Sequence, residues 1–416
     1  MRKTRSIHVI RKFVFDEWGK TESVVWNLAK NLSEKGIDAK IAATNALSSK
    51  SFSVVDGVPI NRFNYFYPYL NLKPDSIQAL DRKGGNPYSY PLYKYLLNTR
   101  QVDILHCHTM ERIANAVRLV AKKKKIPYVI SFHGGMFEAP KSELNEMMKP
   151  LQGSFNYGKI IDAILKNNHY LTDVDGIVCA GYNEYMVTKV KFPDKVVEYI
   201  PNGVDVERYK IAGKNDFREK YQIHPDSELI LCVGRIDHHK NQIKLIELLD
   251  VLKQRRENVH VLLIGPISSE SYKRKLDKRI IELQLEKDVT FIHELKATDQ
   301  ELIKAYDAAD FFILPSTHEP FGSITLEAWA SRLPVIVHKV GGLRHLIKDN
   351  ETGLFFSDNS LDDLVDKFYK MRDSVGARVR IIQNSYLEVS QKYSWSAVTD
   401  QLVEFYQKVI THYNTK

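Results

Sequence analysis

Residues 310–340 read DFFILPSTHEPFGSITLEAWASRLPVIVHKV, and this stretch decides the fold class. Its two apolar runs, 310–316 and 334–340, are separated by a turn and by a segment with helical spacing that starts near Ser323. Near-continuous apolar strands joined by a helix are typical of a parallel sheet that is covered on both faces. The stretch therefore predicts a strand–helix–strand unit of an α/β protein.

The same alternation runs along nearly the whole chain, in two series. We expect strands at 6–10, 38–44, 103–108, 127–133, 176–181 and 196–201 in the first half, and at 228–234, 259–265, 289–295, 310–316, 334–340 and 353–358 in the second. Helical periodicity fills several of the gaps, as at 21–36, a helix that Gly36 would end. Two such series predict two doubly wound sheets.

The chain has 416 residues, which is enough for two domains of about 200 residues each. The segment 200–217 carries turn residues without a clear period, so we expect it to be the linker. We place two Rossmann-like domains at 1–200 and 201–393, facing each other across a cleft. Residues 394–416 should form a long amphipathic helix with no strand after it, which could pack on either domain.

The composition, with 44% hydrophobic and 27% charged residues, is that of a soluble globular protein. No apolar run approaches the roughly 20 residues that a membrane-spanning helix needs, and the basic start is typical of a first strand rather than of a signal peptide. Cys107, Cys179 and Cys232 all lie inside apolar runs, as buried free thiols of a reducing compartment do. We therefore expect a cytoplasmic protein.

A net charge of +9, from 60 basic and 51 acidic residues, favours anionic partners such as phosphorylated ligands or lipid head groups. The densest basic run is Lys122–Lys125, which is either a solvated helix end or a docking site. The sequence has no zinc-finger spacing, no RNA-binding motif and no arginine-rich tail. We expect at most a loose peripheral contact with anionic membranes, and no nucleic-acid partner.

Polar residues that follow strand ends define the candidate site, because ligands of open α/β sheets bind beyond the carboxyl ends of the strands. After 310–316, a turn leads to the helix that starts near Ser323, and a helix N-terminus favours phosphate. Gly322 allows close approach of a ligand, while Glu319 and Glu327 can accept hydrogen bonds from sugar hydroxyls. A helix start between two acids predicts a nucleotide-sugar site, with one acid for the transferred sugar and the other for the ribose.

Cations and a histidine follow two other predicted strands. Arg235 and Lys240 lie just past the first strand of the second half, where two fixed positive charges suit a diphosphate whose charge grows as the sugar leaves. His133 lies at a strand tip beside Gly134 and Gly135. These residues extend the predicted site into the first domain.

His106 and His108 alternate on one strand face, with Cys107 on the other. Zinc ligation is an alternative for this pair, but the sequence shows no matching distal cluster of ligand residues. We also find no Asp-x-Asp motif at the end of a predicted strand that would hold a divalent ion beside a diphosphate. No metal and no other cofactor is therefore expected.

The combination resembles the retaining glycosyltransferases of the GT-B fold, specifically the large family four (glycosyltransferase group 1), along nearly the whole chain. The segments that carry the resemblance are 18–36, DILHCH (103–108), His133, IPNGVD (200–205), VGRIDHHKNQ (233–242), EPFGSITLEAWASRLPVI (319–336), VGGLRHLI (340–347) and NETGLFF (350–356). The double-glutamate segment together with the Val-Gly-Arg step and its following lysine is highly specific, whereas each remaining piece is weak alone.

The resemblance implies a role for each site residue. Arg235 and Lys240 would bind the donor diphosphate, Glu319 would contact the donor sugar, and Glu327 would contact the ribose. His133 would lie near the sugar at the reaction centre, which makes it a candidate catalytic residue with Arg235, Lys240 and Glu319. Further donor contacts would come from Pro320, Phe321, Gly322 and Ser323.

The resemblance also assigns the domains: 1–200 would bind the acceptor, 201–393 would bind the donor, and 394–416 would pack back on the first domain. One position departs from the family. Such enzymes commonly carry Gly-Gly after the first strand, whereas this sequence has Gly19 and Lys20. Gly19 can still offer its backbone to the donor, and Lys20 is either a substitute phosphate contact or a sign that the acceptor approaches differently.

The implied activity is transfer of a sugar from a UDP- or GDP-sugar to a hydroxyl of a saccharide or lipid-linked acceptor, with retention and without a metal. The acceptor hydroxyl would attack the face that the nucleotide leaves, and a phosphate oxygen would accept its proton. Loops 64–92 and 134–160 are expected to select the acceptor. Synthesis of cell-surface polysaccharide or another glycoconjugate is the expected setting.

Three other functions remain open. A glycoside hydrolase also uses two carboxylates, but it needs them on either side of one bond, about 5 Å or about 6.5–9.5 Å apart. In such an enzyme Arg235 and Lys240 would have no function. A sugar-nucleotide epimerase of the same architecture would interconvert UDP-sugars without an acceptor. A non-catalytic sugar-binding protein would bind nucleotide without turnover.

Overall fold

The computed structural model describes residues 4–15, 19–134, 147–210, 214–293, 295, 299–357 and 360–415. The chain divides into two compact units. Unit 1 comprises Met1–Asn202 and Val398–Lys416, and unit 2 comprises Gly203–Ala397. Each unit is built on a largely parallel sheet with helices between its strands, so the predicted α/β, Rossmann-like fold class is confirmed.

Unit 1 contains an eight-stranded sheet. Its strands are β1 (Arg5–Lys12), β2 (Asp38–Thr44), β3 (Phe52–Val55), β4 (Val58–Phe63), β6 (Ile104–Cys107), β7 (Tyr128–Phe132), β9 (Gly176–Cys179) and β10 (Val196–Tyr199). They lie in the order β10-β9-β7-β6-β1-β2-β4-β3, and only β3 and β4 are antiparallel. The strand order reverses between β1 and β6, which makes the loops that follow these two strands the expected ligand-binding edge.

Helices pack on both faces of this sheet. The helices of unit 1 are α1 (Lys20–Glu34), α2 (Pro74–Arg82), α3 (Tyr90–Asn98), α4 (Glu111–Lys124), α6 (Gly158–Ile164), α7 (Tyr182–Lys191) and the unit 1 part of α16 (Trp395–Thr415), with short 3₁₀ turns at Lys149–Leu151 and Asn167–His169. A two-residue pair, β5 (Tyr69–Leu70) and β8 (Phe155–Asn156), lies apart from the main sheet.

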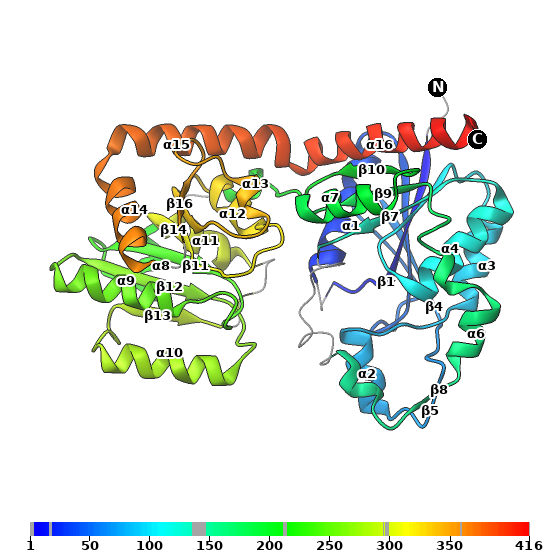
Figure 1. Ribbon diagram of the computed structural model, residues 1–416, viewed down its shortest axis with the longest axis horizontal. Coiled ribbons are helices and arrows are strands. Elements are labelled where there is room, and N and C mark those ends of the chain that lie inside the picture. Colours follow the sequence, from blue (N-terminus) through cyan, green and yellow to red (C-terminus); the bar gives the residue numbers. More distant parts are fainter. Residues whose placement is uncertain are drawn as a thin grey trace. The chain divides into compact units, whose positions relative to one another are not determined.

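The two faces of the unit 1 sheet differ in chemistry. One face forms an apolar core with α3 and α4, to which Val9, Cys107 and Ile130 contribute. On the other face α16 packs against β9 (Figure 1). The two elements are so close that a Cβ added at Gly176 on β9 would meet side-chain atoms of Val409 on α16. That second face also carries buried histidines.

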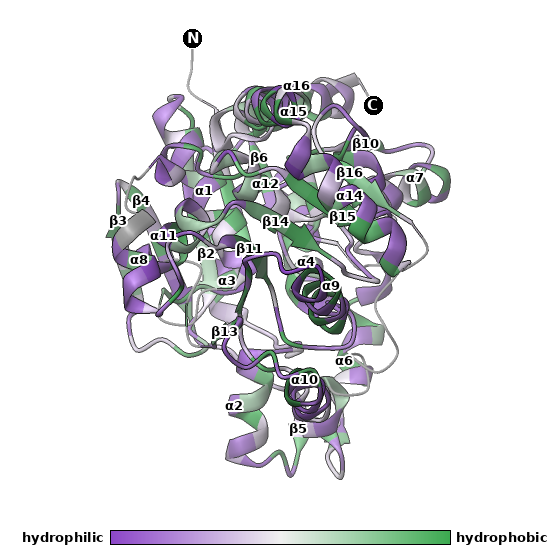
Figure 2. Ribbon diagram, turned by 90° about the vertical axis from the view of Figure 1, so that its left-hand side faces the viewer, coloured by the Kyte–Doolittle hydropathy of each residue, from purple (hydrophilic) through white to green (hydrophobic). Residues whose placement is uncertain are grey.

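Unit 2 contains a six-stranded parallel sheet. Its strands are β11 (Glu228–Val233), β12 (Val259–Ile264), β13 (Val289–Ile292), β14 (Phe311–Leu314), β15 (Val335–His338) and β16 (Leu354–Phe356). Their order, β13-β12-β11-β14-β15-β16, is the dinucleotide-fold order 3-2-1-4-5-6. The reversal lies between β11 and β14, and the strands on its far side, β14 and β15, are largely apolar (Figure 2).

The unit 2 sheet is enclosed by helices. They are α8 (Lys214–Lys220), α9 (Ile243–Gln254), α10 (Glu270–Glu282), α11 (Gln300–Ala308), α12 (Ser323–Ala330), α13 (Leu343–Leu346), α14 (Leu361–Asp373) and α15 (Val375–Glu388), with a 3₁₀ turn at Glu207–Tyr209 and a π-helical turn at Val389–Tyr393. Of these, α9 to α13 connect the strands, α8 precedes β11, and α14 and α15 follow β16. Together the helices bury one continuous apolar core, in which Trp329 and Phe312 are fully enclosed.

Each of the twelve predicted strands overlaps an observed strand, but the sequence analysis missed the edge hairpin β3–β4. The hairpin turns at Asp56 and Gly57, both of which have positive φ angles, 43° and 79°. Asp-Gly between strand-like residues is a strong hairpin signal, because this turn type requires positive φ at both central positions. The sequence therefore contained the information that identifies this hairpin.

The basic run at the end of α4 is partly engaged within unit 1. Lys122 forms an ion pair with Asp173, and Lys124 Nζ donates to the carbonyl oxygens of Leu97 and Thr99 at 3.0 and 2.6 Å. Lysines in a last turn also stabilise a helix C-terminus. These contacts favour the helix-end interpretation of this run.

All three cysteines are buried and free, as predicted. No helix in the described parts of the chain is both long enough and apolar enough to cross a membrane.

Candidate functional site

The predicted donor residues of unit 2 lie on two loops, one after β11 and one after β14. Thr317 N–H donates to the His239 carbonyl oxygen at 2.8 Å, and Asn241 Nδ2 donates to the Pro315 carbonyl oxygen at 3.4 Å. The loops are thus fastened to each other at the point where the strand order reverses. Ligands of such sheets bind at this point, so the structure brings the two predicted groups together.

Lys240 and Glu319 form an ion pair, with Lys240 Nζ donating to Glu319 Oε2. Their side chains are 14% and 10% exposed. Separate ligands, a diphosphate and a sugar, are predicted for these two residues from the sequence, and their contact with each other is not. An ammonium carries three N–H donors, so one bond to Glu319 leaves two for a further acceptor.

Arg235 is the more accessible of the two predicted cations, with a side chain that is 50% exposed. Its Nε lies 3.4 Å from Asp237 Oδ2, and its carbonyl oxygen accepts a hydrogen bond from Gln242 Nε2 at 2.8 Å. Arg235 is therefore anchored at one side of the guanidinium and open to an anion at the other.

Asp237 organises the cationic loop, and the sequence analysis missed it. Its buried carboxylate accepts the backbone N–H groups of His239 and Lys240 through Oδ1, at 2.9 and 3.0 Å. Oδ2 accepts the Ser268 hydroxyl at 3.0 Å. An Asp that bonds to backbone amides two and three residues later is a recognised turn signal, and it could have identified this role.

The turn into α12 depends on Gly322, which caps the helix with φ 97°, as the predicted helix start requires. A Cβ at this position would also meet Leu343. Phe321 is buried in the core of unit 2, so its side chain anchors the turn, and only its backbone remains for a ligand. Pro320 and Ser323 are half-buried on either side of it.

A glycine pair after β15 supports the same turn. Gly342 N–H donates to the Glu319 carbonyl oxygen at 2.8 Å. A Cβ on Gly341 would collide with that carbonyl oxygen, and a Cβ on Gly342 would collide with the carbonyl oxygen of Pro320. These glycines therefore allow the loop after β15 to pack closely against the backbone of the loop after β14.

Glu327 projects from α12 and is not a solvated helix residue. Tyr306 donates its hydroxyl to Glu327 Oε2 at 2.8 Å, and the Tyr209 hydroxyl forms a second hydrogen bond with the carboxyl group. Burial raises the pKa of Glu327, although both tyrosine hydrogen bonds lower it. The two tyrosines hold the Glu327 carboxyl group in place, and the role of these tyrosines was not predicted from the sequence.

The candidate residues of unit 1 are Gly19, Lys20 and His133. Gly19 is the N-cap of α1, and its carbonyl oxygen accepts Ser23 N–H at 3.0 Å. Lys20 is the first helical residue, and its charge helps to lower the pKa of His133. The structure thus places the unexpected lysine close to the predicted reaction-centre histidine.

His133 follows β7, and its Nε2 lies 3.1 Å from His108 Nδ1. Burial, and then the charge of Lys20, lower the pKa of His133 to about 3, so its ring is neutral at pH 7. Its buried Nδ1 has no hydrogen-bond partner in the described parts of the chain. Gly135 and the rest of 135–146, which include much of the predicted loop 134–160, lie outside the described residues.

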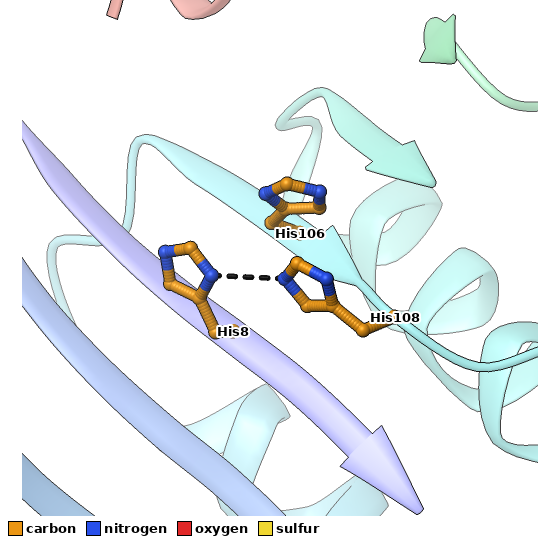
Figure 3. Close-up of side chains that lie close together, drawn as sticks. All are labelled: His8, His106 and His108. Carbon is orange, nitrogen blue, oxygen red and sulfur yellow. Dashed lines mark hydrogen bonds between the residues drawn. The ribbon is translucent and has the colours of Figure 1, made fainter. Parts of the chain in front are cut away.

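His106 and His108 do have a distal partner, which the sequence analysis did not find. His8 on β1 is in register with His106 on β6, and its Nδ1 lies 2.9 Å from His108 Nε2 (Figure 3). The ring nitrogens of the three histidines lie within 4.8 Å of one another. Because His8 and His108 are 100 residues apart, only the register of the two strands reveals the cluster.

Part of the predicted acceptor loop 64–92 lines a cavity of about 380 Å³ in unit 1. Its walls include four aromatic side chains, from Phe66, Tyr88, Tyr90 and Tyr93. Arg112 lies over the Tyr88 ring at 4.9 Å and is held by Asp162 at 2.8 Å. An aromatic wall of this kind suits stacking on a sugar ring or contact with a lipid.

Two family models match the chain, one in each half. The model described as Glycosyltransferase Family 4 matches residues 21–208, and the model described as Glycosyl transferases group 1 matches residues 213–388. Together they include every predicted site residue except Gly19 and Lys20, which lie just before the first match.

Curated relatives include three glycosyltransferases. An uncharacterized glycosyltransferase of Methanocaldococcus jannaschii is 25% identical over 75% of this chain and 77% of the relative. Sulfoquinovosyl transferase of Arabidopsis thaliana is 24% identical over 89% of this chain and 76% of the relative. Alpha-monoglucosyldiacylglycerol synthase of Streptococcus pneumoniae is 28% identical over 63% of this chain and 57% of the relative.

Solved structures share the fold along almost the whole chain. A glycosyltransferase from Rickettsia africae superposes with a TM-score of 0.71 at 18% identity, covering 99% of both chains. A protein from Anabaena, solved with UDP and glucose, superposes with a TM-score of 0.67 at 16% identity, covering 97% of this chain and 100% of the other. With both halves matched by the family models, the chain belongs to the group 1, family four glycosyltransferases of the GT-B fold.

Proposed function

We propose that this chain transfers a sugar from a UDP- or GDP-sugar to a hydroxyl of a saccharide or lipid-linked acceptor, with retention at the anomeric carbon and without a metal ion. The observation that carries the proposal is the junction of the two loops after β11 and β14. It gathers two cations, a helix start and an acid where a nucleotide would bind. The Anabaena neighbour solved with UDP and glucose supports a nucleotide-sugar donor.

In this proposal the donor diphosphate binds between Arg235, Lys240 and the start of α12. The free side of the Arg235 guanidinium and the remaining N–H groups of Lys240 would accept the charge that develops as the sugar leaves. Glu319, held by Lys240, would orient the transferred sugar, and Glu327, held by two tyrosines, would accept hydrogen bonds from the ribose.

The proposed step needs no nucleophile from the protein. The acceptor oxygen forms a bond to the anomeric carbon on the face from which the diphosphate departs, as the bond between that carbon and the phosphate oxygen breaks. The acceptor proton moves to a phosphate oxygen of the leaving group. Atoms and charge balance without a side chain that changes protonation, and the configuration at the anomeric carbon is retained.

For the acceptor, the aromatic cavity beside loop 64–92 supports a sugar or lipid partner. The name of the Streptococcus pneumoniae relative includes a diacylglycerol, which supports a lipid-linked hydroxyl as one acceptor class. We propose synthesis of a polysaccharide or glycoconjugate in the cytoplasm, with a loose contact to anionic membranes driven by the net charge of +9.

The test is incubation of the purified chain with UDP-, GDP- and ADP-sugars and with free or lipid-linked sugar acceptors, with products read by proton NMR. We expect one donor to yield a glycoside with the anomeric configuration of that donor. An inverted product would contradict retention. Interconversion of a UDP-sugar without an acceptor would identify an epimerase, and nucleotide binding without turnover on any acceptor would identify a sugar-binding protein.

A further inference from the structure

A hydrogen-bonded row of histidines runs from the half-buried His133 into the interior of unit 1. From His133 Nε2 it runs to His108 Nδ1 over 3.1 Å, and from His108 Nε2 to His8 Nδ1 over 2.9 Å (Figure 3). The His8 side chain is fully buried, and that of His108 is 4% exposed. The row therefore connects the predicted reaction-centre residue with the interior of unit 1.

The row continues through two hydroxyls to a fourth histidine. The Tyr406 hydroxyl lies 3.5 Å from His8 Nε2 and 2.6 Å from His106 Nδ1. On its other side, His106 Nε2 lies 2.6 Å from Ser131 Oγ. His8 lies on β1, His106 on β6 and Ser131 on β7, which are adjacent strands, and His108 and His133 directly follow β6 and β7. The tyrosine comes from α16.

A metal ion explains this arrangement less well. Zinc ligands direct their lone pairs at one common point, about 2.0–2.1 Å from each nitrogen. Here His8 Nδ1 and His108 Nε2 are directed at each other, and both nitrogens of His106 are engaged by hydroxyls. The cluster in the described residues holds three histidines and neither a carboxylate nor a thiolate to offset a divalent charge.

Each ring in the row is neutral. Burial lowers the pKa of His8 to about 3 and lowers those of His106 and His108 well below their usual value. A neutral imidazole has one nitrogen that donates and one that accepts. The direction of one hydrogen bond therefore fixes the directions of its neighbours along the row, except at Tyr406, whose oxygen can also accept from His8 and His106 together. That mixed arrangement leaves two groups unpaired, the Tyr406 O–H and the lone pair of His133 Nδ1, so the comparison rests on the two arrangements in which every group both donates and accepts.

The two arrangements leave different groups unpaired. In the first, every bond points toward His133: Ser131 donates to His106, and the donation continues through Tyr406, His8 and His108. His133 then accepts at Nε2 and carries its proton on Nδ1. Only that N–H then lacks a partner among the described residues. In the second, every bond is reversed, and two groups lack a partner, the Ser131 O–H and the lone pair of His133 Nδ1. The first arrangement is favoured, because buried unpaired polar groups are costly.

We propose that His108 and His8 are positioning residues that act through His133 by holding it in the tautomer with the proton on Nδ1, ready to donate to a ligand oxygen. This inference rests on the proposed function only for the identity of that ligand, the donor sugar. Tyr406 on α16 also helps to select this tautomer, because its hydroxyl connects His8 to His106.

The test is histidine ¹⁵N NMR of the whole chain without donor or acceptor, since the two neutral tautomers have distinct nitrogen shifts. The His133 signal is assigned by its loss in His133→Asn. Tyr406→Phe separates His106 and Ser131 from the rest of the row, after which both directions of the segment His133–His108–His8 leave two unpaired nitrogens. Tyr128→Phe is the matched control, because Tyr128 is an equally buried tyrosine that bonds to the Tyr170 carbonyl oxygen instead.

We expect the Nδ1–H tautomer of His133 in the native chain and in Tyr128→Phe, and comparable populations of both tautomers in Tyr406→Phe. A native His133 protonated on Nε2, or an unchanged tautomer in Tyr406→Phe, would overturn the proposal. So would one equivalent of zinc in the purified chain with the signals of His8 and His106 at metal-bound positions. Because these readouts need no turnover, a failure of transferase activity with the expected tautomers counts only against the proposed function.

Discussion

Lys240 and Glu319 pair across the point where the strand order of the unit 2 sheet reverses. One residue comes from the loop after β11 and the other from the loop after β14, so the pair fastens the two halves of the candidate donor site. Each residue is also predicted to contact the donor. Removal of either one then has two effects, the loss of a donor contact and the release of a mostly buried opposite charge.

We expect Glu319→Ala to lower kcat/KM for the donor by about 100-fold or more while the fold survives, which is the scale of losing one preorganised polar contact to the reacting groups. Steady-state kinetics with the true donor measure kcat/KM, and circular dichroism shows whether the fold is intact. Glu286→Ala, which removes an exposed acid of unit 2, is the control. Native turnover in Glu319→Ala would remove Glu319 from the site.

Glu327→Gln should separate stability from activity. Burial raises the pKa of Glu327 above its usual 4.5, so the folded chain holds this proton to a higher pH than the unfolded chain does. Ionisation then opposes folding above that range, and the variant should gain in Tm relative to the native chain as the pH rises from 4.5 to 8. Its activity should fall at least tenfold, because an amide replaces the acceptor proposed for the ribose.

Calorimetric melting at several pH values and kinetics on the same samples test this expectation. A variant that is less stable at every pH would show that the tyrosine hydrogen bonds outweigh burial. A fully active variant would place the ribose elsewhere.

Asp237→Ala should loosen the loop that carries Arg235 and Lys240. The carboxylate accepts two backbone N–H groups and one hydroxyl, and hydrogen bonds to a charged group contribute about 1.5–3 kcal/mol each. We expect a lower stability and a higher KM for the donor. Ser268→Ala removes only the hydroxyl contact and should have a much smaller effect on KM, so equal effects of the two variants would contradict a role for the backbone contacts.

The proposal without a metal ion predicts full activity in excess EDTA, because Arg235, Lys240 and the start of α12 would carry the leaving-group charge. The measurement is the initial rate before and after chelation, followed by addition of magnesium or manganese. Activity that disappears with EDTA and returns with either ion would show that the ion takes part.

Much of the fold was predictable because its signal is local. Apolar runs of four to eight residues identify buried strands, and each of the twelve predicted strands overlaps an observed one. The same runs located Arg235 and Glu319, since both follow strand ends. The β3–β4 hairpin was missed although Asp56-Gly57 encodes it, because neither of its short strands has a long apolar run.

Partnerships between distant residues were not predictable from the sequence. The Lys240–Glu319 pair and the contact of His8 with His108 depend on which strands become neighbours and in what register. The tyrosines around Glu327 depend on how α11 and the turn at Glu207–Tyr209 pack against α12. A single sequence gives strand positions but not register, and a shift by one residue would turn His8 to the other face of the sheet. That dependence explains why the histidine cluster was judged incomplete.

The central claim is that a nucleotide diphosphate binds at the junction of the loops after β11 and β14. Isothermal titration of UDP, GDP and ADP into the native chain and into Arg235→Ala and Lys240→Met tests it most directly. We expect one nucleotide to bind the native chain, and each variant to bind it at least tenfold more weakly with an unchanged far-ultraviolet spectrum. Equal affinity in all three proteins, or no binding of any nucleotide to the native chain, would contradict the account.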